Sequence, residues 1–424
     1  MMEKITIHNY RCFELLSLNF KEGVNLFIGD NSSGKTTLIR ALSTVLNSFF
    51  IGFSDENTRF LGLSPNDFSV LESETGLANE PAIKIDFTNL QVNASLELHS
   101  KKGRTLQKPL DAINKVGKSL YKNLFEDKVQ KETLPLFASF STADIHTTRK
   151  INREKFKNYD QKPSFGYYEC LQGDGFLDYW TKRLLILKEA QKGEIEIEGV
   201  RLAIQKALGV DGCNVIEDMQ IRHNQGRVYY ILTDKREVET ALLSDGLTRL
   251  VNIVLDLSFR CMLLNKGIFG IEACSKTKGT VLIDEIDLHL HPSLQSLVVK
   301  GLQNAFPQLQ FIITSHSPLV MSGIADNEKN VIYKLAYAKE KGYTVQEVQT
   351  YGLDASTIIE TVLGVTPRTK DVNDRLNTLF SFIDIDDYIK AANYLHEMKK
   401  EFGDNLPELA KAETMLNLLS DSND

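Results

Sequence analysis

The chain has few cysteines, no excess of positive charge and no long apolar run. Its 5 cysteines are widely spaced in 424 residues and form no C-x-x-C pair, which argues against disulfide staples and structural zinc and favours a reducing cytoplasm. No window approaches ~18 uninterrupted apolar residues, so no transmembrane helix is expected. The start, Met1 to Lys4, has no apolar stretch typical of a signal peptide. The net charge of −7 means that contact with nucleic acid must come from a local patch or a partner.

Composition and periodicity instead indicate a globular protein of two or three domains. Hydrophobic residues make up 42% of the chain and charged residues 25%, enough for a sizeable core. Alternating or continuous apolar runs predict strands at 4–8, 15–20, 24–28, 83–87, 92–98, 134–140, 215–221, 228–233, 281–283 and 311–314. Helical periodicity is found at 37–46, 176–188, 199–208, 247–264 and 294–304, and after about residue 350 only helix-like segments remain.

The most informative segment is the G-x-x-x-x-G-K-T motif at residues 29–36, between the strand 24–28 and the helix 37–46. Its glycines permit backbone angles that turn N–H groups inward as a nest for phosphate oxygens, and the following helix directs its positive end at the anion. Lys35 adds charge toward the β and γ phosphates, and the Thr36 hydroxyl is placed to bind Mg²⁺. The motif therefore predicts an ATP·Mg²⁺ site. The expected nucleotide contacts are Gly29, Asn31, Ser32, Ser33, Gly34, Lys35, Thr36 and Thr37.

Two carboxylates end a β-favouring apolar segment, at Asp284 and Glu285. A buried central strand would bring Asp284 to the Mg²⁺ shell and place Glu285 where a water could attack the γ-phosphate. The alternative is a core strand that happens to end in acids. We favour the first interpretation because the segment follows the phosphate-binding loop in the expected order.

A second phosphate-binding element is expected where Leu243-Ser244-Asp245-Gly246 precedes the long helix. Ser244 is an N-cap by position. In the functional interpretation Ser244, Gly246 and the helix dipole form a cradle for phosphate. Such a cradle is useful only if it completes the nucleotide site of another subunit.

Histidines follow both of the strands at 281–283 and 311–314. His316, flanked by serines, is a candidate γ-phosphate sensor, although a lone histidine is more often structural. Asp287, His289 and His291 resemble a metal-ligand set. We prefer a loop that contacts the partner subunit, because no further soft ligand lies nearby.

Together these motifs resemble the ABC-type ATPases of the RecF, SMC and OLD group, over residues 1–50 and about 210–335. The resemblance implies an α/β fold, a P-loop ATPase head with a mixed sheet and flanking helices. It also implies that two heads sandwich two ATP molecules, so that Ser244 of one chain faces Lys35 of another. The segment Asn9 to Phe13 looks like the group's N-terminal N-[FY]-[KR]-x-[FL] element, which nominates Arg11 as a nucleotide neighbour. Two departures are that the usual L-S-G-G is L-S-D-G here and that the group's Q-loop glutamine has no clear counterpart. No long heptad insertion is present, so the chain is no coiled-coil SMC protein.

The expected domains are an N-terminal part of the head (1–100), a mostly helical inserted lobe (101–210), a C-terminal part of the head (211–350) and a helical region for partner binding (351–424). The tail looks like that of the PtuA ATPases of Septu and retron-associated anti-phage systems, which implies an HNH nuclease, PtuB, as partner. Asp384-x-Asp386 also invites comparison with a Toprim nuclease, but no strand-like glutamate site precedes it. Helix capping by Asp384 is the preferred interpretation, and no nuclease chemistry is expected in this chain.

Basic residues gather in two stretches, 101–131 and 149–162. Either they are solvated helical faces or they form a DNA-facing patch that contacts phosphates without reading bases. Three functions follow: an ATPase subunit of a defence complex that controls a partner nuclease, a RecF-like repair ATPase that loads on DNA, or a nucleotide-sensing scaffold with negligible hydrolysis. All three predict a homo-oligomer, at least a head-to-head dimer, in the cytoplasm and without membrane contact.

Overall fold

A computed structural model describes the chain except for residues 70, 73–77, 80–81, 126–129, 131, 143–161, 174–175, 326, 341 and 422–424. Its contacts divide the chain into two compact units, unit 1 (Met1–Ala355) and unit 2 (Ser356–Asp424). No helix among the described residues combines the length and hydropathy needed to cross a bilayer.

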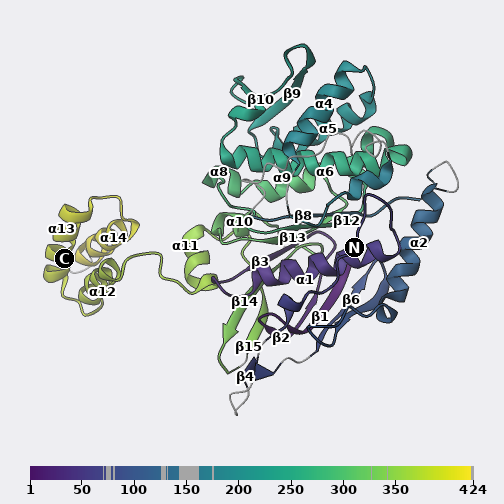
Figure 1. Ribbon diagram of the computed structural model, residues 1–424. Helices are drawn as coiled ribbons and strands as arrows, with labels where there is room; N and C mark the ends of the chain where they lie inside the picture. Colours follow the sequence, from purple (N-terminus) through teal and green to yellow (C-terminus); the bar gives the residue numbers. More distant parts are fainter. Residues whose placement is uncertain are drawn as a thin grey trace. The chain divides into compact units, whose positions relative to one another are not determined.

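Unit 1 is built on a six-stranded sheet in the order β15-β14-β3-β13-β12-β8 (Figure 1). Its strands are β3 (Val24–Ile28), β8 (Leu136–Phe140), β12 (Gly279–Ile283), β13 (Leu309–Thr314), β14 (Val331–Ala338) and β15 (Gly342–Val348). All pairings are parallel except that of β14 with β15. Every residue of β3, β8, β12 and β13 is buried, as expected for parallel strands that are covered on both faces.

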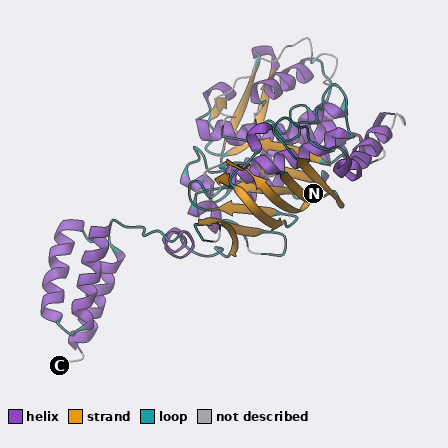
Figure 2. Cartoon of the chain, turned by 60° about the horizontal axis from the view of Figure 1, so that its bottom comes forward, coloured by secondary structure: helices purple, strands orange, loops and turns teal. Residues whose placement is uncertain are grey.

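A second sheet is antiparallel, in the order β2-β1-β6-β7 (Figure 2). It comprises β1 (Met2–Tyr10), β2 (Phe13–Asn19), β6 (Ile83–Asn89) and β7 (Val92–Leu98), and a short separate pair is formed by β4 (Leu71–Glu72) and β5 (Ala78–Asn79). Helix α1 (Lys35–Asn47) contacts β12 and β13 of the first sheet and β6 of the second. The phosphate-binding motif lies between the carboxyl end of β3 and the first turn of α1.

Helices gather beyond the six-stranded sheet with a small three-stranded sheet (Figure 1). This helical lobe contains α4 (Leu177–Glu189), α5 (Glu194–Leu208), α6 (Asp245–Phe269), α7 (Ala273–Lys276), β9 (Ile216–Arg222), β10 (Arg227–Leu232) and β11 (Glu237–Glu239). The long helix α6 is central to the packing of this lobe, since it contacts α4, α5, α7 and strand β8. Among the described residues, unit 1 also contains the helices α2 (Asp111–Phe125), α8 (Pro292–Gln295), α9 (Val298–Ala305) and α10 (Pro318–Ser322).

Unit 2 is a bundle of three helices, α12 (Lys370–Asp384), α13 (Tyr388–Phe402) and α14 (Pro407–Asp421). They are preceded by α11 (Ala355–Thr357) and a π-helical turn at Ile358–Leu363. Leu379, Ala391 and Leu409, one from each helix, are fully buried in a shared core. Asp387, rather than the expected Asp384, caps a helix: its carboxylate accepts a hydrogen bond from the Lys390 N–H, whereas Asp384 is the last residue of α12.

The architecture confirms the expected fold class, a mixed sheet with flanking helices, a helical lobe and C-terminal helices. Two ranges are organised differently from the expected domains. Residues 101–210 also supply β8 to the central sheet, because the run Leu136–Phe140 is apolar enough to be buried on both faces. The helical lobe also extends past residue 210, since α5 packs against β9 and α6.

Candidate nucleotide site

The phosphate-binding loop leaves β3 at Ile28 and enters α1 at Lys35. Gly29 and Gly34 have φ angles of 144° and 93°, and Ser32 has a φ of 72°. Close neighbours also require glycine at both positions: a Cβ on Gly29 would lie 2.2 Å from the Leu335 carbonyl oxygen, and one on Gly34 would lie 2.6 Å from the Phe13 ring. Left-handed residues within a turn allow neighbouring N–H groups to point inward, which is the backbone arrangement of an anion-binding nest.

The Lys35 ammonium is held inside this loop. It donates hydrogen bonds to the carbonyl oxygens of Gly29 and Asp30, each at 2.9 Å, and its side chain is buried. Burial lowers the pKa of Lys35, and the carboxylates of Asp284 and Glu285 offset part of that effect. The buried Lys35 ammonium lies at the N-terminus of α1, and both the charge and the helix end favour binding of a polyanion such as a triphosphate.

Helix α1 and the ends of strands β12 and β13 bring a chain of hydrogen bonds to the same sheet edge. The Thr36 hydroxyl donates to Asp284 Oδ2 at 3.0 Å, and the Thr314 hydroxyl donates to Asp284 Oδ1 at 2.6 Å. Asp284 itself is only 4% exposed. A threonine hydroxyl and a buried carboxylate are oxygen ligands of the kind that Mg²⁺ takes, so Thr36 and Asp284 fit the expected ion.

Glu285 follows Asp284 in a left-handed conformation, with a φ of 52° that a glutamate rarely adopts. Its N–H donates to the Thr314 hydroxyl at 2.7 Å, and the next N–H, that of Ile286, donates to the Thr314 carbonyl oxygen at 3.0 Å. Thr314 thus fixes the turn that separates the two acids. Glu285 is half-buried, beside the fully enclosed Asp284.

Helix α6 links the segment Leu243–Gly246, the second expected phosphate-binding element, to this sheet edge. Ser244 is the N-cap of α6, its side chain accepts no capping hydrogen bond, and Ser244 and Asp245 are both exposed. Gly246 is buried against the next loop, where a Cβ would lie 2.4 Å from the His289 carbonyl oxygen. Arg249, one turn further along, donates to the Asp284 carbonyl oxygen at 2.7 Å.

The remaining candidates lie around the same edge with different partners. His316 is exposed directly after β13, between the buried Ser315 and Ser317. The Ser317 hydroxyl caps α10 and donates to Gln295 Oε1 at 2.6 Å. His289 is exposed with a φ of 60°, and His291 caps α8. No group of three metal-binding side chains occurs within the part of the chain that the structure describes, so the set around Asp287 does not assemble a metal site there.

Arg11 lies in the turn between β1 and β2, with its side chain paired to Asp67. The Nη2 atom is 2.6 Å from Asp67 Oδ1, and the Arg11 N–H also donates to the Asp67 carbonyl oxygen at 2.9 Å. The same turn touches the phosphate-binding loop, since the Cys12 Sγ and the Phe13 ring both face Gly34. The element therefore reaches the loop, while the Arg11 guanidinium is engaged by a carboxylate.

Sequence reasoning missed two positions. Thr314 was noticed only as the end of a strand, yet it binds both acids through one hydroxyl. Arg249 was not singled out, although its place one turn after Gly246 in a helix that must pack on the sheet was a usable signal.

Known proteins resemble the chain over the same segments. Residues 24–322 match a family model described as "AAA domain, putative AbiEii toxin, Type IV TA system". A "Retron Vc95 probable ATPase" of Vibrio cholerae is 25% identical over 393 residues, which cover 79% of this chain and 74% of that protein. A "Septu protein PtuA" of Bacillus thuringiensis is 24% identical over 365 residues, covering 82% of this chain and 81% of that protein. A "DNA replication and repair protein RecF" of Leptospira interrogans is 30% identical over 121 residues, covering 26% of this chain and 33% of that protein.

Proposed function

The chain belongs to the AAA-domain family whose model it matches over residues 24–322, and we propose that it is the ATP-hydrolysing subunit of an anti-phage defence complex. Its resemblance to ABC-type ATPases, and to retron and Septu proteins over most of its length, supports this assignment. In the proposed complex, ATP binding or hydrolysis controls a partner nuclease of the HNH type. The helices of unit 2 are the proposed contact region for that partner.

One observation carries the ATPase assignment: the hydrogen-bonded chain Thr36–Asp284–Thr314 joins the phosphate-binding loop to the end of β12. Lys35 and the loop N–H groups would hold the phosphates. Thr36 and Asp284 would hold Mg²⁺, which would neutralise negative charge on the phosphate oxygens. Glu285 would accept a proton from the attacking water, and His316 would contact the γ-phosphate.

A second copy of the chain would complete the site. Ser244 is exposed at the N-terminus of α6 with its hydroxyl unused by the helix, which is the arrangement needed to receive a phosphate from outside the chain. In a head-to-head dimer, Ser244 and Gly246 of one copy would face Lys35 of the other.

Substitution of Glu285 tests the catalytic assignment. Glu285→Gln keeps the size of the side chain and removes its basicity, so we expect ATP to bind as tightly as in the wild type while steady-state turnover falls at least about 100-fold. Lys35→Ala should instead remove binding itself. Turnover of Glu285→Gln equal to that of the wild type would refute the role of Glu285.

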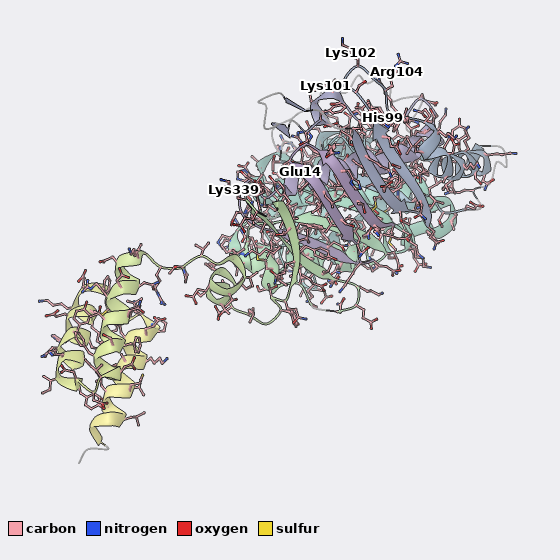
Figure 3. All side chains as sticks on the ribbon, turned by 90° about the horizontal axis from the view of Figure 1, so that it is seen from below. Glu14, His99, Lys101, Lys102, Arg104 and Lys339 are labelled. Carbon is pink, nitrogen blue, oxygen red and sulfur yellow. The ribbon has the colours of Figure 1, made fainter. Side chains whose placement is uncertain are left out.

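A direct action on DNA is the competing function, and one feature favours it. Lys101, Lys102 and Arg104 are exposed on the loop after β7 (Figure 3), and α2 carries exposed lysines at positions 115, 118 and 122. The second basic stretch, 149–162, lies outside the described residues up to position 161. Turnover stimulated by duplex DNA in the absence of any partner would favour this function, whereas DNA-independent turnover would favour control of a partner.

A further inference from the structure

A row of aromatic rings leads away from the phosphate-binding loop along the hairpin β14–β15. The Phe13 ring lies against Gly34, and its centroid is 5.0 Å from that of Tyr343 in an edge-on arrangement. The Tyr343 ring is in turn 5.0 Å from the Tyr337 ring, because the two residues are directly paired across the hairpin. Exposure increases along the row: Phe13 is 0% exposed, Tyr343 is half-buried and Tyr337 is 60% exposed.

The hairpin is held against the loop. The Gly29 backbone approaches Leu335 of β14 so closely that a Cβ would lie 2.2 Å from the Leu335 carbonyl oxygen. The Tyr343 hydroxyl lies 3.5 Å from the Ser32 carbonyl oxygen. Burial and the neighbouring Cys12 thiol raise the pKa of Tyr343 to about 12, so the phenol stays neutral at physiological pH.

Sheet order gives this row a direction relative to a bound nucleotide. β3, which carries the loop, has β13 on one side and β14 on the other. Outside the loop and α1, the groups expected at the γ-phosphate and Mg²⁺ (Asp284, Glu285 and His316) come from the ends of β12 and β13. A nucleoside triphosphate is an extended molecule with its base at the end opposite the γ-phosphate, so a nucleotide with its γ-phosphate on the β13–β12 side would extend its base toward the β14 side.

We propose that Tyr343 and Tyr337 form the wall on which the base of the bound nucleotide stacks. The inference rests on the proposed nucleotide site and adds the residues that hold the end of the ligand farthest from the chemistry. The Tyr337 ring is exposed beside the phosphate-binding loop, and a purine offers it a π-face of matching size. A wall that contacts the π-face of the base, and not its hydrogen-bonding edge, favours purines over pyrimidines and discriminates little between adenine and guanine.

The test compares a ligand with a base and one without. The dissociation constants of ATP and of inorganic tripolyphosphate are measured for Tyr343→Ala and Tyr337→Ala in the Glu285→Gln background, where turnover does not consume the ligand. Loss of the stacking ring should weaken ATP binding by about 5- to 100-fold and leave tripolyphosphate binding unchanged. Tyr343→Phe should retain most of the ATP affinity because it keeps the ring. Tyr351→Ala is the matched control, since Tyr351 is 62% exposed and follows the far end of β15.

Equal weakening of both ligands would overturn the proposal, because the tyrosines would then only support the loop at Ser32. Unchanged ATP affinity in both alanine variants would overturn it as well. Failure of the parent protein to bind either ligand would instead refute the nucleotide site on which the proposal rests.

Discussion

A single hydroxyl, that of Thr314, organises the two acids of the candidate site. It donates to Asp284 Oδ1 and accepts the Glu285 N–H, which holds Glu285 in its left-handed conformation. Asp284 can therefore remain buried with both carboxylate oxygens engaged, while the next residue turns toward solvent. Strain of this kind persists where surrounding contacts fix it, and it concentrates at functional sites.

Thr314→Val removes that hydroxyl and keeps the shape of the side chain. The Asp284 carboxylate loses one of its orienting partners and the Glu285 N–H loses its acceptor. Loss of a hydrogen-bond partner of a metal ligand typically weakens metal binding by about 10- to 100-fold. We therefore expect half-saturation at a Mg²⁺ concentration about 10-fold higher, with a lower maximal turnover. Titration of ATPase activity with Mg²⁺ checks this. The control is Thr414→Val in unit 2, where an exposed hydroxyl donates to a carbonyl oxygen of its own helix. An unchanged Mg²⁺ curve in Thr314→Val would show that Asp284 does not need the Thr314 hydroxyl to bind Mg²⁺.

At the scale of elements, the helical lobe depends on a buried ionic cluster between α4, α5 and α6. Glu196 of α5 is 1% exposed and accepts from Arg183 Nε at 2.6 Å and from Lys266 Nζ at 2.5 Å. Burial alone would raise the pKa of Glu196, but the hydrogen bond and charge of Arg183, with help from Lys266, lower it below the ordinary value. Removal of the Glu196 carboxylate would leave the Arg183 side chain charged and buried without this partner.

Glu196→Ala should therefore cost about 3–5 kcal/mol of unfolding free energy, measured by chemical denaturation. Since the folded pKa of Glu196 is lowered, its stabilisation is present above the unfolded value of about 4.3 and is lost as the pH falls through the folded value. The difference between wild type and variant should accordingly shrink in acid. Glu272→Ala, which breaks the exposed pair with Lys276, should destabilise the protein far less, because solvent screens that pair. Equal costs for the two variants would contradict the role of burial.

Elements with strong local signals could be predicted from the sequence. The strand 24–28 appears as β3 with the same bounds, and the hairpin around Gly226, whose φ is 66°, appears as β9 and β10. The motif order along the chain also indicated which segments would share a sheet edge. These signals are local, because turn residues and apolar runs act over a few positions.

Features that depend on distant contacts could not be predicted. No strand was expected at Val331–Ala338, although Val331, Tyr333, Leu335 and Tyr337 recur with the period of a strand. Its parallel pairing with β3, about 300 residues away in sequence, had no local signal. The contact of Arg249 with the Asp284 carbonyl oxygen exists only once α6 packs beside the end of β12. The pairing of Arg11 with Asp67 likewise required a loop whose fold had no sequence signal.

At the scale of the whole molecule, the candidate site combines buried and exposed groups of one head. Lys35 and Asp284 are buried at the sheet edge, and the Thr36 hydroxyl is hydrogen-bonded to Asp284, whereas Ser244 and Asp245 are exposed at the start of α6. Gly246 and the His289 backbone pack against each other, so the segment Leu243–Gly246 and the loop after β12 are neighbours. A second head docked on this surface would contribute to both.

Subunit complementation between Lys35→Ala and Ser244→Arg tests this arrangement most directly. If each nucleotide site takes Lys35 from one chain and Ser244 from another, both variants are inactive alone, and a mixed dimer contains one intact site and one doubly defective site. An equimolar mixture should then recover about one quarter of wild-type ATP hydrolysis, because about half of randomly paired dimers are mixed and each has one of its two sites intact. A mixture that forms mixed oligomers and yet remains as inactive as the separate variants would contradict a site shared between two heads.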